Sequence, residues 1–133
     1  MLEWNSSLIV HHPDIDRQHL EMVVLLNLLN EAVREHRSRQ LVGSLLDDLL
    51  VHTRHHFASE EQIMASLGCP GLDDHCAMHR TLDAQLVDVR AGFQNSGGAI
   101  SLDLLDYLKN WFVTHITEMD APSFMAAVQD PTR

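Results

Sequence analysis

The sequence has few cysteines, few aromatic residues and few basic residues, and each scarcity argues against a class of protein. Its two cysteines, Cys69 and Cys76, match no Cys-x-x-Cys metal or redox site, so we expect free thiols. Nine lysines and arginines are outnumbered by nineteen aspartates and glutamates, which gives a formal net charge of −10. Nucleic acids and anionic membranes are poor partners for a chain of that charge.

Long apolar runs are missing as well. No segment approaches 18 uninterrupted apolar residues, so we expect no membrane-spanning helix. The first ten residues lack a basic region followed by an apolar one, so we expect no signal peptide and a cytoplasmic location. Apolar residues still make up 45% of the 133 residues, which is enough for one folded domain over residues 1–133.

Apolar residues recur at helical spacing in four stretches, and no stretch alternates with the period of a strand. The predicted helices cover about residues 16–36, 40–67, 73–93 and 101–119. Short links separate them, and the second and third links contain glycine, so we predict an all-α, antiparallel up-down-up-down four-helix bundle over about residues 16–120. We expect an irregular N-terminal arm (residues 1–15) packed on the bundle, and a C-terminal tail (residues 121–133) with a short helix at 123–128.

Histidine is in excess, with ten in the chain, and several histidines fall at metal-ligand spacing. Side chains four residues apart stack on one helix face, so two of them can converge on one ion or on neighbouring ions. Each predicted helix supplies at least one candidate ligand, and the full set is His19, His56, Glu60, His75, His79, His115 and Asp120. Taken singly, each fits an ordinary core histidine or a solvated carboxylate. Together, seven thiolate-free ligands exceed the need of one ion and suit two.

Asp120 fits this pattern less regularly than the other candidates. In a regular α-helix a residue five positions after His115 lies about 140° away from its face. Asp120 can reach the same metal pair only if the helix is distorted, by a π-type bulge or by ending there. Pro122 favours such a distortion because it removes a backbone donor and crowds the preceding turn.

Four stretches surround the candidate ligands: Ile15-Asp16-Arg17-Gln18-His19, His56-Phe57-Ala58-Ser59-Glu60-Glu61 with Met64, His75-Cys76-Ala77-Met78-His79, and Trp111-Phe112-Val113-Thr114-His115-Ile116 with Asp120. Together they resemble the hemerythrin family, specifically its bacterial single-domain members, from Trp4 to about Phe124. The resemblance implies two iron ions with an oxo or hydroxo bridge. It places His75, His79 and His115 on one iron and His19 and His56 on the other. Glu60 and Asp120 bridge the pair.

With that arrangement the first iron is six-coordinate and the second is five-coordinate. The resemblance implies that O2 binds end-on at the five-coordinate iron and is held as hydroperoxide. The expected function is O2 storage, delivery or scavenging. The resemblance also implies that nitric oxide, azide and other small anions can bind at such a site. Nucleic acids and membranes are not expected as partners.

Three apolar residues near His115 are expected to line the O2 pocket and keep out protons and reductants: Trp111, Phe112 and Ile116. Ordinary core packing is compatible with the same role. Phe112 stands where the family commonly has leucine, which would narrow O2 access. His52, one turn before His56, stands where the family often has tyrosine. We expect it to support a ligand, with packing, exposure or direct ligation as alternatives.

Three other functions remain open for such a chain. One is an O2 or redox sensor that signals through a separate partner. Another is an enzyme with peroxidase, nitric oxide reductase or oxidase chemistry at the same centre. No additional acid–base residue is arranged for catalysis, so we expect a binding protein and no enzyme. The last is a structural bundle without metal.

Overall fold

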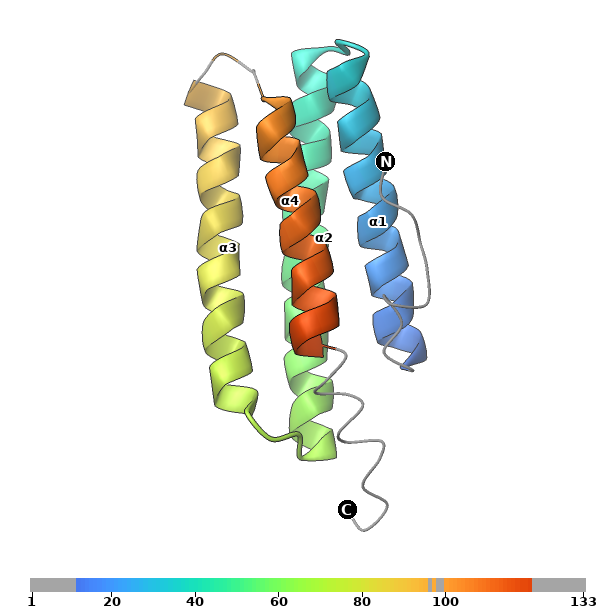
Figure 1. Ribbon diagram of the computed structural model, residues 1–133, viewed down its shortest axis with the longest axis vertical. Helices are drawn as coiled ribbons and strands as arrows, with labels where there is room; N and C mark the ends of the chain where they lie inside the picture. Colours follow the sequence, from blue (N-terminus) through green and yellow to red (C-terminus); the bar gives the residue numbers. More distant parts are fainter. Residues whose placement is uncertain (1–11, 96, 98–99, 121–133) are drawn as a thin grey trace.

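The computed structural model describes residues 12–95, 97 and 100–120, with side chains described as far as Thr117. Helices run up and down in alternation over this part of the chain (Figure 1). Their bounds are α1 (Pro13–Arg34), α2 (Arg39–Leu67), α3 (Leu72–Asn95), α4 (Leu102–Thr114) and the π-helix η2 (His115–Asp120). The predicted all-α four-helix bundle is confirmed. Among the described helices, none combines the length and the apolar character that crossing a membrane requires.

The ends of the helices follow from local chemistry that the sequence carries. The Ser101 side chain accepts a hydrogen bond from the backbone N–H of Leu104 at 3.1 Å, which caps the start of α4. Gly68 ends α2 in the left-handed conformation, at φ 66°. The backbone N–H of Cys69 then bonds the carbonyl of Met64 at 3.0 Å, which satisfies an acceptor at the end of the helix.

Helix α1 begins at Pro13, three residues earlier than predicted. The expectation of an irregular arm is therefore wrong for residues 13–15. Proline suits the first helical position because its fixed φ is already helical and its missing N–H is not needed there. Asp14 and Asp16 favour the same start because negative charge stabilises the first turn. The rest of the arm, residues 1–11, and the tail with its expected short helix lie outside the described residues.

The last helix changes its winding at the point where the sequence indicated a distortion. The α-helical hydrogen bonding of α4 stops at Thr114, and His115–Asp120 form a π-helix. A π-helix bonds residues five apart, so it brings the backbone of Asp120 back above His115. The predicted π-type distortion is thus present in the backbone. The side chain of Asp120 lies outside the described part of the structure.

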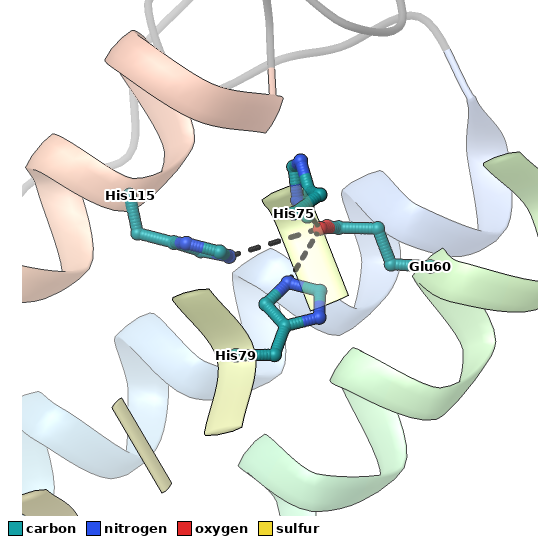
Figure 2. Close-up of side chains that lie close together, drawn as sticks. All are labelled: Glu60, His75, His79 and His115. Carbon is teal, nitrogen blue, oxygen red and sulfur yellow. Dashed lines mark hydrogen bonds and ion pairs between the residues drawn. The ribbon is translucent and has the colours of Figure 1, made fainter. Parts of the chain in front are cut away.

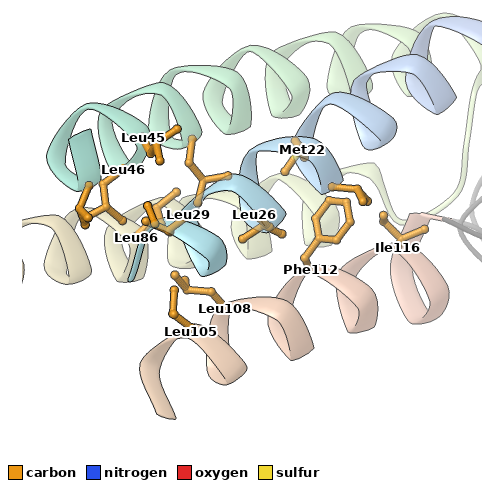
Figure 3. Close-up of a cluster of buried hydrophobic side chains, with 14 of the residues drawn as sticks. Met22, Leu26, Leu29, Leu45, Leu46, Leu86, Leu105, Leu108, Phe112 and Ile116 are labelled. Carbon is orange, nitrogen blue, oxygen red and sulfur yellow. The ribbon is translucent and has the colours of Figure 1, made fainter. Parts of the chain in front are cut away.

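The hydrophobic core packs along the inside of the bundle next to the histidine cluster. Figure 3 shows leucines from all four α-helices facing one another, with Phe112 and Ile116 beside them. Burying one such side chain stabilises the fold by about 1.5–3 kcal/mol. Phe112 is completely buried and its ring lies edge-on to the imidazole of His19, with ring centres 6.2 Å apart. The apolar core therefore lies directly against the candidate metal ligands.

Candidate metal centre

Six of the seven predicted ligand residues are buried and converge inside the bundle: His19, His56, Glu60, His75, His79 and His115. They form two overlapping groups that share Glu60. Within each group, one potential ligand atom per residue lies within 4.8 Å of the others. Helices α1, α2 and α3 and the start of η2 all contribute, so the cluster exists only in the folded bundle.

Three imidazoles meet one oxygen of Glu60 (Figure 2). The Nε2 atoms of His79 and His115 lie 3.0 Å and 3.8 Å from Glu60 Oε1. His75 Nε2 contacts the same oxygen at short range. His75 and His79 are one turn apart on α3, so the helix presents both rings to the same point. The arrangement has the shape of a three-nitrogen, one-oxygen metal site.

Two further imidazoles lie near the other oxygen of Glu60. His56 Nε2 is 3.1 Å from Glu60 Oε2, and His19 Nε2 is 3.2 Å from His56 Nε2. Glu60 thus turns Oε1 toward three histidines and Oε2 toward the pair. A carboxylate placed in this way can bridge two ions, with one oxygen on each.

Two of the candidate ligand imidazoles are oriented by partners on their outer nitrogens. His56 Nδ1 donates to Gln18 Oε1 at 3.0 Å, and His79 Nδ1 donates to Glu61 Oε2 at 2.9 Å. Because Nδ1 carries the proton, Nε2 keeps its lone pair and faces the centre of the cluster. Sequence reasoning gave neither Gln18 nor Glu61 a role. The available signal was that each is next in sequence to a candidate ligand.

Glu61 is held as a carboxylate by its surroundings. Burial raises the pKa of Glu61, but hydrogen bonds from Cys76 and His79 and the charge of Arg80 together lower it below its usual value. The Glu61 carboxylate in turn raises the pKa of the Cys76 thiol, chiefly by accepting its hydrogen bond. Cys76 is therefore a protonated donor to Glu61, as expected of a free thiol.

Aromatic rings enclose the cluster. The rings of Phe57 and His79 stack at 4.0 Å with an angle of 7° between them. Trp111, which is half-buried, stacks on His115 with ring centres 6.1 Å apart. Ile116 is completely buried, as is Phe112 beside His19. Phe57 was not singled out from the sequence, although its place directly after His56 in a helix could have indicated it.

His52 does not join the cluster, contrary to the expectation that it supports a ligand. Its side chain is 44% exposed, and Nδ1 lies 3.6 Å from Glu21 Oε2 on the outside of the bundle. The inward position of that turn belongs to Thr53, which is completely buried. His52 is eight residues before Glu60, which rotates it by about 80° from the face of Glu60 in a regular helix.

Comparison with known proteins agrees with this geometry. The family model described as hemerythrin HHE cation binding domain matches residues 11–127. The chain belongs to the hemerythrin HHE family. A bacteriohemerythrin of Stenotrophomonas maltophilia is 32% identical over 116 residues, which cover 87% of this chain and 74% of that protein. A myohemerythrin of Riftia pachyptila is 26% identical over 117 residues, which cover 88% and 86%.

Solved structures show the same fold. The crystal structure of a wild-type hemerythrin matches with a TM-score of 0.83 at 24% identity and covers 93% of this chain and 98% of that one. At this identity the similarity establishes the arrangement of the hemerythrin-family helices. The chemistry of this chain's centre rests on its own side chains.

Proposed function

We propose that this hemerythrin-family chain holds two iron ions, bridged by an oxo or hydroxo group, and binds O2 reversibly at them. The observation that carries the proposal is the placement of Glu60. It is completely buried, with three imidazoles around one oxygen and an imidazole pair at the other. A buried carboxylate of this kind calls for compensating positive charge, which two divalent ions provide.

The donor set fits iron. It consists of imidazoles and carboxylate without thiolate, a set that suits iron among the transition metals. We assign His75, His79 and His115 to one ion, His19 and His56 to the other, and Glu60 to both. Asp120 completes the bridge in this proposal. The π-helix supports that role because it returns the residue five after His115 to the same face.

The two-histidine ion has fewer protein ligands, so the proposed O2 position lies there, with end-on binding. When bound, a reduced iron pair supplies an open coordination position and electrons for O2. The chain's own contribution is enclosure. Phe112 and Ile116 are completely buried, and the ring of Phe112 stands beside His19. A wall of this kind keeps water and protons from the pocket, as reversible binding requires.

The hydrogen bonds of the neighbouring polar side chains favour binding over catalysis. Gln18 and Glu61 accept hydrogen bonds from ligand imidazoles on the outside of the cluster. Each is thereby committed to orienting a ligand and is not turned to the pocket as an acid or base. A cytoplasmic location is part of the same proposal, and cell fractionation tests it.

Metal content and oxygen uptake test the proposal together. After iron-replete expression we expect two irons per chain and uptake of one O2 per iron pair by the reduced protein. Glu60→Gln keeps the size of the side chain but removes its charge, so we expect it to lose at least one iron and the uptake. His52→Ala is the matched control, and it should keep both. A wild-type chain that holds fewer than two irons would refute the proposal.

A further inference from the structure

The two halves of the cluster are supported by different chemistry on their outer side. In the three-histidine half, His79 Nδ1 donates a hydrogen bond to the carboxylate of Glu61 at 2.9 Å. In the two-histidine half, His56 Nδ1 donates a hydrogen bond to the neutral amide oxygen of Gln18 at 3.0 Å. The two distances are nearly equal, so these two contacts differ mainly in the charge of the acceptor.

An anionic acceptor strengthens a metal-bound imidazole more than a neutral one does. A carboxylate draws the Nδ1 proton toward itself, which raises electron density at Nε2 and strengthens its bond to a cation. An amide orients the ring in the same way but adds little to its donor strength. Hydrogen bonds to a charged group are also roughly twice as strong as neutral ones, so the carboxylate holds its ring more firmly.

Glu61 is well placed for this effect. It receives hydrogen bonds from both His79 and Cys76, which fix the carboxylate from two sides. Its side chain is 35% exposed, so solvent screens part of its charge. Gln18 is buried, at 7% exposure, so its amide has little access to bulk water.

We propose that Glu61 and Gln18 are positioning residues that make the two metal positions unequal, with the three-histidine position filled first. The third imidazole at that position also raises its metal affinity, and the hydrogen bond to Glu61 raises it further. The inequality is set by residues that touch no metal, so it can be changed without removing a ligand. This inference rests on the proposed metal pair but not on O2 binding.

A titration of the metal-free chain with Co2+ alone, followed by visible absorption and by isothermal calorimetry, tests the inference. The wild-type chain should bind two Co2+ in two resolved steps. Glu61→Gln should weaken the first step by about 10- to 100-fold and leave the second little changed. Gln18→Glu should strengthen the second step and bring the two closer together.

Asp83→Asn is the matched control. Asp83 is also acidic, but it pairs with Arg54 at 2.7 Å on the surface of the bundle. Its replacement removes the same charge without touching a ligand imidazole, so both steps should stay as in the wild type. Thermal unfolding of each metal-free variant checks that the bundle is folded. If Glu61→Gln lowers stability too far, Glu61→Asp serves in its place, because a shorter carboxylate lengthens the same contact.

The ring N–H protons give a readout that a merely structural role would not move. In the Zn2+-loaded chain, the Nδ1 proton of His79 should resonate further downfield than that of His56, and Glu61→Gln should shift it upfield. Equal first-step affinities in wild type and Glu61→Gln, with two Co2+ bound in both, would overturn the inference. Binding of fewer than two Co2+ by the wild type would instead count against the proposed metal pair.

Discussion

Replacement of Phe112 by alanine tests whether one side chain both packs the hydrophobic core and shields the metal centre from water. Phe112 is completely buried, belongs to the core cluster with Met22 and Ile116, and lies edge-on to His19. Truncating a buried phenylalanine costs about 3–5 kcal/mol, because the lost contacts leave a cavity. Domains of this kind are stable by about 5–15 kcal/mol, so the variant should remain folded but marginal. The melting temperature should fall by on the order of 15 °C.

Urea unfolding of the metal-free chain, followed by circular dichroism at 222 nm, measures that loss. Leu86→Ala is the matched control, since Leu86 is a buried core residue of α3 outside the ligand cluster and should cost about 2–5 kcal/mol. Phe112→Ala should also speed oxidation of the reduced, iron-loaded protein in air, because the cavity beside His19 admits water. An unfolding free energy within about 1 kcal/mol of wild type, or equal oxidation rates in the two variants, would refute this double role of Phe112.

Three further predictions concern Cys76, a helix end and His52. Since Glu61 raises the pKa of the Cys76 thiol, alkylation by iodoacetamide at pH 8 should be slow and should quicken in Glu61→Gln; an unchanged rate would contradict the contact. Gly68→Ala should lower the unfolding free energy by about 1 kcal/mol, because the φ of Gly68 is +66°. Gly92 lies within α3 with no atom close to an added Cβ, so Gly92→Ala should raise the unfolding free energy by a similar amount. His52→Ala should leave Co2+ affinity unchanged, and a tenfold loss would place it at the centre after all.

Much of the fold could be predicted because the signals are local. The helices follow from apolar spacing, and their ends follow from Ser101, Gly68 and neighbouring residues whose caps act within one turn. The start at Pro13 was not predicted, because residues 1–15 show no helical periodicity of apolar residues and were therefore expected to be irregular. Proline favours a helix start through its fixed φ, which apolar periodicity does not reveal. A distortion near Asp120, either a π-type bulge or an end of the helix, was expected because Asp120 falls off the face of His115 in a regular helix, and the structure has the π-helix.

The cluster itself was predictable only in part. Spacing of four places His75 and His79 on one face, but which oxygen of Glu60 each ring meets depends on how the helices pack. The contacts of Gln18 and Glu61 join different helices, so no local pattern encodes them. His52 shows the opposite limit. A helix face is broad, and small rotations decide whether a residue near its edge turns inward or toward solvent.

The most direct test of the account is one anaerobic cycle with the iron-loaded protein. The reduced protein is exposed to O2, its visible absorption is recorded, and the gas is then removed under vacuum. We predict a visible band that appears with O2, persists, and disappears on evacuation, with the reduced spectrum recovered over several cycles. Immediate conversion to an oxidised form that evacuation does not reverse would contradict reversible O2 binding at the centre built around Glu60.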